Sequence, residues 1–289
     1  MSGDLSPTNQ CAPAPRAFAG DALVITCEHG GNRIPPPYRD LFAPHRALLD
    51  SHRGFDAGAL IMARALAEQF GVPLLSATFS RLLVDLNRSV WHRQLHFEPV
   101  VELPDTRRQQ ILKRYYHPYR SQVERLVTEA IAASGRVIHL SCHSFTPELD
   151  GHRRTADIGL LYDPARPGEK ALCARWKRMF ALHAPELAVR RNYPYAGRND
   201  GLTTWLRKRY STEAYVGIEL ELNQKHVMRT TQQWATLREA VIESLHAAMT
   251  VCDDPAAKPK PVRGPNRTAP PESSYALPEP TRRTTGVRT

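Results

Sequence analysis

The chain has 289 residues, of which 42% are hydrophobic, and it carries a formal net charge of +10. That length is enough for one large domain or two smaller ones with a sizeable core. No apolar stretch approaches the ~18 residues of a transmembrane helix, and the N-terminus lacks the pattern of a signal peptide. Five scattered cysteines without a Cys-x-x-Cys spacing favour a cytoplasmic protein with free thiols.

The positive charge is divided between a tail and the rest of the chain. Residues 253–289 contain seven Lys and Arg against four Asp and Glu. The densest basic run elsewhere, residues 207–209, is typical of one solvated helix end. Because no nucleic-acid motif accompanies this charge, we expect an anionic small molecule as the partner, and neither nucleic acid nor a membrane.

Composition divides the chain into three parts. Residues 1–20 are rich in Pro, Ala and Ser and predict a flexible arm. Residues 253–289 are rich in Pro and have no apolar period, which predicts a disordered basic tail. We therefore expect a single folded domain over residues 21–252.

Within this domain, strand-like and helix-like segments alternate along the chain. In chain order, we predict a strand at 22–27, a helix at 56–70, strands at 74–79 and 82–86, a helical region at 104–134 that is broken before Pro118, strands at 137–142 and 158–161, helices at 168–183 and 203–210, a strand at 214–222 and a helix at 231–250. This alternation predicts an α/β domain with a largely parallel or mixed central sheet.

Three of the predicted strands carry polar groups at their ends. The first strand runs into His29 and two glycines, another ends in His143, and a third carries Glu219 and Glu221. Ligands bind at the carboxyl ends of strands in open α/β sheets. Either histidine alone could be a surface or core residue, but together with the acids they indicate a metal-assisted hydrolase.

Zinc takes imidazole nitrogens and carboxylate oxygens, and catalytic zinc sites keep one position for a water whose proton a nearby carboxylate accepts. Glu219 and Glu221 are two apart on a strand, so both point to one face. One of them could be the base and the other its support. An exposed edge strand is the alternative, which the apolar opposite face, residues 218, 220 and 222, disfavours.

Two further segments are candidates for substrate binding. The apolar run at 82–86 leads into Asn87 and Arg88; an arginine fork binds carboxylates, and an asparagine can donate to an oxyanion. The alternative is a simple turn with an Asp85–Arg88 salt bridge. The loop at 191–201 mixes aromatic residues with arginines and could line a specificity pocket or be an ordinary long turn.

Other chemistries have little support in the sequence. Cys142 and His143 are adjacent on a strand and therefore face opposite sides, which disfavours a thiol–imidazole pair. The chain has no Gly-x-Ser-x-Gly elbow and no phosphate-binding motif of the Gly-x-Gly-x-x-Gly or Walker type.

Taken together, these motifs give the chain a family resemblance. The chain resembles the N-formylglutamate amidohydrolase family, which is similar to zinc carboxypeptidases and aspartoacylase-type deacylases. The matching stretches are CEHGGNR at 27–33, DLNR at 85–88, CHSF at 142–145, GLLY at 159–162, NYPYAG at 192–197 and GIELELNQ at 217–224.

The resemblance implies a three-layer α/β/α fold with a zinc exopeptidase-like mixed sheet and one divalent zinc ion. It implies that His29 and His143 are ligands and that Asn87 and Arg88 bind the substrate carboxylate. It also implies a catalytic glutamate on the last strand, where the spacing to Gln224 favours Glu221 over Glu219.

One position departs from the pattern of those relatives. Their His-x-x-Glu pair here ends in Asn32, and a neutral amide is a poor zinc ligand. The third ligand is then Asp56 or Glu28. Asp56 has an alternative role as the N-cap of the helix that follows it.

Our hypothesis from the sequence is a zinc-dependent amidohydrolase that cleaves the N-acyl, for example N-formyl, amide of an acidic amino acid such as N-formyl-L-glutamate. Arg88 and Arg198 would anchor the substrate carboxylates, and Asn192, in the same loop as Arg198, would also bind the substrate. The alternatives are an amidase or peptidase acting on another N-acyl or peptide substrate, and a metal-free binding protein on this fold. The sequence predicts no oligomeric state.

Overall fold

The computed structural model describes residues 17–18, 20–227 and 230–250. Most of the predicted arm and all of the predicted tail lie outside these residues. Among the described helices, none combines the length and the apolar character that crossing a bilayer requires.

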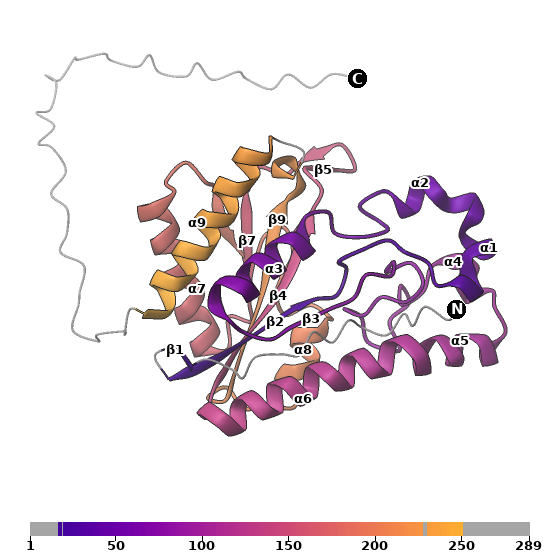
Figure 1. The fold of residues 1–289 in the computed structure, drawn as a ribbon, viewed down its shortest axis with the longest axis horizontal. Helices are drawn as coiled ribbons and strands as arrows, with labels where there is room; N and C mark the ends of the chain where they lie inside the picture. The colour runs from indigo at the N-terminus through magenta and orange to yellow at the C-terminus, as the bar shows by residue number, and fades with distance from the viewer. Residues whose placement is uncertain (1–16, 19, 228–229, 251–289) are drawn as a thin grey trace, which may run out of the picture. The chain divides into compact units, whose positions relative to one another are not determined.

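A mixed sheet forms the centre of the fold (Figure 1). Its strands are β1 (Ala17–Phe18), β2 (Asp21–Cys27), β3 (Leu74–Ser76), β4 (Val137–Phe145), β7 (Ile158–Leu161), β8 (Val189–Arg191) and β9 (Tyr215–Asn223). They lie in the order β1-β2-β4-β9-β7-β8, and β3 also pairs with β2. Because β2, β3, β4 and β9 are parallel while β7 runs against β9, the prediction of a mixed, largely parallel sheet is confirmed. A separate small hairpin is made by β5 (Glu148–Leu149) and β6 (His152–Arg153).

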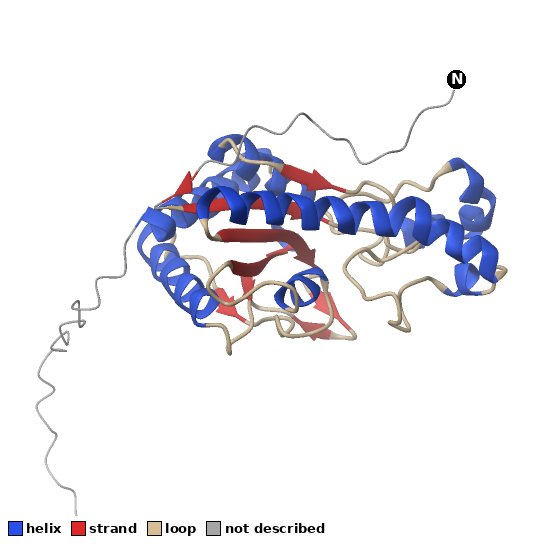
Figure 2. Cartoon of the chain, turned by 90° about the horizontal axis from the view of Figure 1, so that it is seen from below, coloured by secondary structure: helices blue, strands red, loops and turns tan. Residues whose placement is uncertain are grey.

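Helices cover both faces of the sheet, which gives three layers (Figures 1 and 2). The α-helices are α1 (Arg39–Phe42), α2 (Arg46–Leu49), α3 (Ala59–Phe70), α4 (Glu98–Val101), α5 (Asp105–Ile111), α6 (His117–Ser134), α7 (Pro167–His183), α8 (Leu202–Arg207) and α9 (Thr231–Thr250). Short 3₁₀ turns lie at Pro36–Tyr38, Ala43–His45 and Gln224–His226, and a π-helical turn at Leu112–Tyr116. Helices α3, α7 and α9 pack on one face, and α6 and α8 on the other.

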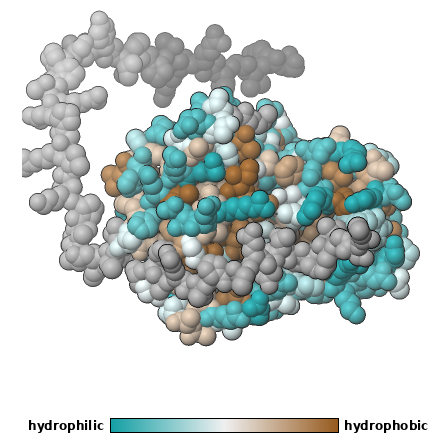
Figure 3. Space-filling model, in the orientation of Figure 1, coloured by the Kyte–Doolittle hydropathy of each residue, from teal (hydrophilic) through white to brown (hydrophobic). Residues whose placement is uncertain are grey.

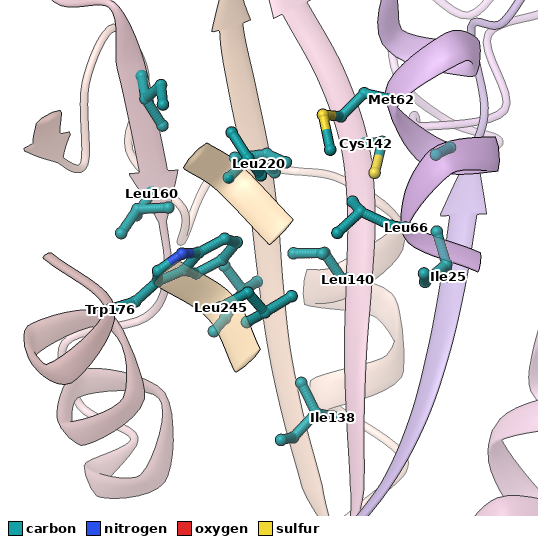
Figure 4. Close-up of a cluster of buried hydrophobic side chains, with 14 of the residues drawn as sticks. Ile25, Met62, Leu66, Ile138, Leu140, Cys142, Leu160, Trp176, Leu220 and Leu245 are labelled. Atoms are coloured by element: carbon teal, nitrogen blue, oxygen red, sulfur yellow. The ribbon is translucent and has the colours of Figure 1, made fainter. Parts of the chain in front are cut away.

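The core under α3, α7 and α9 is almost entirely apolar (Figure 4). Cys142 of β4 faces this core together with Met62 of α3. On the other side of the cluster, Trp176 of α7 is fully buried, stacks on Phe180 at 5.9 Å between ring centroids and donates to Ser244 Oγ at 2.9 Å. This core fixes α7 and α9 on the sheet.

Two predicted elements differ from the structure. Residues 82–86 form turns instead of a strand; Leu83 and Val84 are fully buried, but the backbone bonds locally, with Leu83 N donating to Ser80 O at 3.1 Å. Burial, and not sheet pairing, explains their apolar character. The expected break before Pro118 is a local change from the π-helical turn to α6, because proline is tolerated in the first turn of a helix.

Polar side chains cover most of the face seen in Figure 3, and hydrophobic ones show there as separate patches. The most exposed large hydrophobic side chains, Trp91 (76%) and Leu182 (72%), lie on different parts of the chain. Single exposed hydrophobic residues of this kind are ordinary on protein surfaces.

We predict that Trp176→Ala lowers the free energy of unfolding by about 3–5 kcal/mol, because it removes a large buried ring and leaves a cavity between α7 and α9. Trp176→Phe should cost less, since it keeps most of the apolar volume and loses one ring of the indole and the bond to Ser244. Urea denaturation of the three proteins checks this. Equal losses for both variants would contradict the cavity argument.

Candidate functional site

The strand register brings the predicted polar groups to one edge of the sheet. His143 of β4 lies opposite Glu221 of β9, and Ser141 lies opposite Glu219. Side chains two apart on a strand share a face, so these four project from the α6 side of the sheet. His29 follows the carboxyl end of β2, the other neighbour of β4.

Three of these groups converge in a buried cluster. The ligand atoms of His29, Asp56 and His143 all lie within 4.8 Å of one another. Asp56 Oδ2 lies 3.3 Å from His29 Nδ1 and 2.8 Å from His143 Nδ1. Of the two carboxylates that the sequence offered as a third ligand, Asp56 is the one in this cluster. Helix α3 begins after Gly58 without a side-chain cap, so Asp56 does not cap it.

The outer nitrogens of both imidazoles meet further carboxylates. His29 Nε2 lies 2.7 Å from Asp85 Oδ1, and His143 Nε2 lies 3.1 Å from Glu28 Oε2. Glu28 therefore lies behind His143 and outside the cluster. A carboxylate on the outer nitrogen of a histidine fixes the ring and its tautomer, as is usual for metal-binding histidines.

Arg81 links two of these carboxylates. Its guanidinium donates to Asp56 Oδ1 at 3.2 Å and to Asp85 Oδ2 at 2.9 Å. Burial alone would raise the pKa of both carboxyl groups, but the neighbouring His29 and Arg81 charges hold the pKa of each well below its usual range. Both are therefore ionised at neutral pH.

Glu28 is embedded in hydrogen bonds on the sheet face under α6. Tyr119 OH donates to its Oε1 at 2.8 Å and Ser141 Oγ to its Oε2 at 2.5 Å. Burial would raise the pKa of Glu28, but the bond and charge of His143 lower it well below its usual range. For His143, burial acts to lower the pKa, and its bonds to Asp56 and Glu28 raise it well above its usual value.

The two glutamates of β9 differ in environment. Glu219 Oε1 accepts a hydrogen bond from Thr203 Oγ1 at 2.7 Å. Glu221 is 5% exposed, and its Oε2 is buried without a hydrogen-bond partner among the described residues. Burial, reinforced by the charges of Asp56 and Glu219, raises the pKa of Glu221 to about 8 in spite of His143. Glu221 is thus the carboxyl group poised to hold or release a proton.

Asn87 and Arg88 lie beside the cluster. Asn87 Nδ2 is 3.4 Å from His143 Nε2, and its Oδ1 accepts from Leu202 N at 2.6 Å. Arg88 keeps a long contact of 3.8 Å to Asp85 Oδ2 and donates to the Asp200 carbonyl at 3.3 Å. The weakness of both contacts leaves much of this guanidinium available to a ligand.

The loop at 191–201 reaches the site through residues other than those expected. Arg198 is exposed and does not line the cleft. Asn192 holds the loop itself, since its Oδ1 accepts from Tyr162 N at 3.0 Å and Gly197 N at 3.1 Å. Tyr195 is the aromatic residue of this loop that lines the cleft.

Sequence reasoning missed the supporting residues of the cluster. The sequence indicates Asp85 only as a partner of Arg88 and assigns no role to Arg81, Tyr119 and Ser141. One local signal in the sequence could have indicated Asp85, because an Asp at the end of an apolar run often forms an Asx-turn. In the structure, the backbone N of Asn87 donates to Asp85 Oδ1 at 2.9 Å, as such a turn requires. Such a turn at the end of an apolar run marks a fixed carboxylate.

These groups open into a cleft of about 740 Å³. Its inner end is lined by the following residues: His29, Asp56, Arg81, Asp85, Asn87, Arg88, His143, Glu219 and Glu221. Cys142 faces the helix core on the opposite side of the sheet, and burial raises the pKa of its thiol. The structure therefore gives no support to thiol chemistry.

A second buried polar chain lies below the cluster on the same sheet face. His139 Nε2 is 2.9 Å from Thr26 Oγ1, and its Nδ1 is 2.7 Å from Tyr215 OH. Burial lowers the pKa of His139 to about 4. The ring is thus neutral in the folded protein at pH 7 and serves to join β2, β4 and β9.

Fold and site together define an α/β protein with a polar cleft at the carboxyl edge of its sheet. The chain belongs to the N-formylglutamate amidohydrolase family, whose sequence profile matches residues 21–228. This membership supports a hydrolase that acts on an amide bond.

Solved structures share this fold. The gene product Atu2144 of Agrobacterium tumefaciens is similar with a TM-score of 0.65 and 29% identity, over 77% of this chain and 90% of that one. N-formylglutamate amidohydrolase from Ralstonia eutropha shares the fold with a TM-score of 0.57 and 22% identity, over 84% of this chain and 95% of that one. No curated protein matches the chain.

We predict that His139 removes stability as the pH falls from about 7.5 toward 4, while the raised pKa values of Glu221 and His143 act in the opposite direction. The unfolded chain protonates this ring with a pKa of about 6.5, whereas the folded pKa is about 4. At this residue the unfolded state therefore binds more protons in this window, and the loss due to His139 approaches about 3 kcal/mol. Urea unfolding across this pH range measures it.

His139→Gln isolates the effect, because an amide can still bond to both neighbours but does not titrate. We expect the free energy of unfolding of this variant, relative to that of the unchanged protein, to rise by up to about 3 kcal/mol as the pH falls across this range. His183→Gln, an exposed position on α7, is the control and should leave the slope unchanged. An unaltered slope in His139→Gln would refute the assignment.

Proposed function

We propose that the protein is a zinc-dependent amidohydrolase that releases the N-formyl group of an acidic amino acid such as N-formyl-L-glutamate. The observation that carries the proposal is a buried, unpartnered Glu221 oxygen beside the cluster of His29, Asp56 and His143. Family membership supports the amide hydrolysis. The expected cytoplasmic location and anionic substrate are part of the proposal.

The residues present fit a zinc ion. Two imidazole nitrogens and one carboxylate oxygen converge, and these are donor types that catalytic zinc sites use with a water in the fourth position. Both imidazoles are backed by a carboxylate on the outer nitrogen, Asp85 behind His29 and Glu28 behind His143. Zinc bound by these residues would acidify a water and polarise the scissile carbonyl.

Glu221 is the proposed general base. Its high pKa makes it a strong proton acceptor once it is ionised, and a nearby cation favours the ionised form. Glu221 takes a proton from the attacking water and then delivers it to the amide nitrogen as the C–N bond breaks. The water oxygen stays with the formate, and the amino acid leaves as the amine.

Asn87 and Arg88 would hold the substrate for this step. The guanidinium of Arg88 can bind a carboxylate through two parallel hydrogen bonds. Asn87 is fixed by Leu202 N through its Oδ1, and its Nδ2 lies 3.4 Å from the outer nitrogen of His143 at the inner end of the cleft, where it would donate to the oxyanion. Glu219, held by Thr203, raises the basicity of Glu221 through its negative charge.

We predict that Glu221→Gln lowers kcat for N-formyl-L-glutamate by about 10²–10⁴, the usual contribution of a general acid–base group, while the metal content is unchanged. Glu219→Gln should lose less. Formate release and elemental analysis of the same preparations check both. Full activity in Glu221→Gln with an inactive Glu219→Gln would transfer the role to Glu219.

A second prediction concerns the metal. Protein supplied with zinc should bind about one ion, and His143→Ala should lose it because one of the donors is removed. Asp85→Asn should bind zinc 10–100-fold more weakly, as is usual when the outer partner of a ligand histidine is changed. Competition with a chromogenic chelator measures these affinities.

Asp40→Asn, at an exposed position on α1, is the matched control and should bind zinc normally. Absence of metal in the unchanged protein after zinc has been supplied would overturn the mechanism and favour a metal-free binding protein.

A further inference from the structure

The cleft continues well beyond the cluster. Besides the inner residues, its walls include Arg53 and the segment from Arg93 to Glu102, which contains α4. Helix α4 lies with α1 and α2, away from the strands (Figure 1). A volume of about 740 Å³ falls within the range of sites for drug-sized ligands, and a single formylated amino acid bound at the cluster would leave this outer end unfilled.

Two cations at the outer end are unpaired. Arg53 and Arg93 are exposed, and neither forms an ion pair with any residue that the structure describes. Arg81 differs, since both Asp56 and Asp85 engage it. Guanidinium groups bind carboxylates and phosphates readily because their planar fork matches two oxygens. Glu98 and Glu102 also line this end, and neither lies within ion-pair distance of Arg53 or Arg93.

The remaining surface of this end suits an amide-linked residue. Phe97 offers a ring face, with the Arg53 guanidinium 5.8 Å from its centroid. His96 Nδ1 lies 2.7 Å from the Leu83 carbonyl; because only a protonated nitrogen can donate to that oxygen, Nε2 is left as an acceptor. The outer end thus presents an apolar face, a hydrogen-bond acceptor and two cationic donors.

Chain connectivity indicates which part of a substrate would reach this end. Arg88, which holds the substrate carboxylate in the proposed function, and Arg93 belong to one continuous loop. A group attached on the carboxylate side of the released amino acid would therefore follow this loop outward.

We propose that the outer end of the cleft is a second binding subsite, in which Arg53 and Arg93 bind a carboxylate carried beyond the amino acid that is released. The substrate class is then N-formyl acidic peptides, such as a formylated glutamate with a further acidic residue on its side-chain carboxyl. The bond hydrolysed is still the formyl amide. This inference rests on the proposed function, whose substrate it specifies.

The test compares four substrates: N-formyl-L-glutamate and its γ-linked peptides with glutamate, glutamine and lysine. We expect kcat/KM for the glutamate peptide to exceed that for each of the others by about tenfold or more, because only this peptide gains charge-assisted hydrogen bonds from Arg53 and Arg93 to its added carboxylate. The double variant Arg53→Gln/Arg93→Gln should remove this advantage and leave the value for N-formyl-L-glutamate unchanged. Arg178→Gln, exposed on α7, is the control.

Equal kcat/KM values for the glutamate and glutamine peptides would overturn the subsite while the proposed function stands. A higher kcat/KM for the lysine peptide, through Glu98 and Glu102, would do the same. If none of the four is hydrolysed, the proposed function fails, and calorimetry on the Glu221→Gln protein decides the subsite separately. A Kd for the glutamate peptide that is tenfold lower than the Kd for the glutamine peptide supports the subsite, provided that the difference disappears when Arg53→Gln and Arg93→Gln are added to Glu221→Gln. Equal Kd values for the two peptides refute it.

Discussion

The site depends on one carboxylate oxygen. Asp56 Oδ2 touches Nδ1 of both His29 and His143, while separate carboxylates meet the outer nitrogens of the two rings. Each imidazole is therefore fixed at both ends and cannot rotate without breaking a buried hydrogen bond. Arg81 donates hydrogen bonds to both Asp56 and Asp85, so these two carboxylates, on opposite sides of the His29 ring, are held in place together. Binding of the proposed zinc ion by the paired histidines would release the proton that His143 holds.

Much of this arrangement could be predicted from the sequence, because it follows from strand geometry. A two-residue period puts Ser141 and His143 on one face of β4 and Cys142 on the other, and the same period groups Glu219 with Glu221. The carboxyl ends of parallel strands meet at one edge, which is sufficient to bring His29 toward His143. The mixed sheet and the positions of the long helices follow from hydrophobic periodicity in the same way.

The rest depended on loops, whose paths local sequence does not determine. From the sequence alone, Glu28 and Asp56 are equivalent candidates for the third ligand. The turn after β2 directs Glu28 into the interface between the sheet and α6. The backbone of Asp56, in contrast, donates from its N to His29 O, and its side chain enters the cluster. Residues 82–86 were mistaken for a strand because burial produces the same apolar run in either case. Arg198 was favoured because its loop is rich in arginine, but the cleft-lining positions of that loop belong to other residues.

The two faces of the sheet also place different requirements on the sequence. The polar groups of the cluster lie on the α6 side or at the carboxyl edge, beside a second apolar core, and the core with α3, α7 and α9 lies on the other side. Substitutions that change the volume of the core with α3, α7 and α9 act on stability, whereas substitutions of the polar groups on the α6 side act on ionisation and, as at His139, on stability as well. Neighbouring positions of one strand, such as Cys142 and His143, therefore have different structural requirements. A chain of this design can acquire thermal stability and new substrate preference along separate mutational routes.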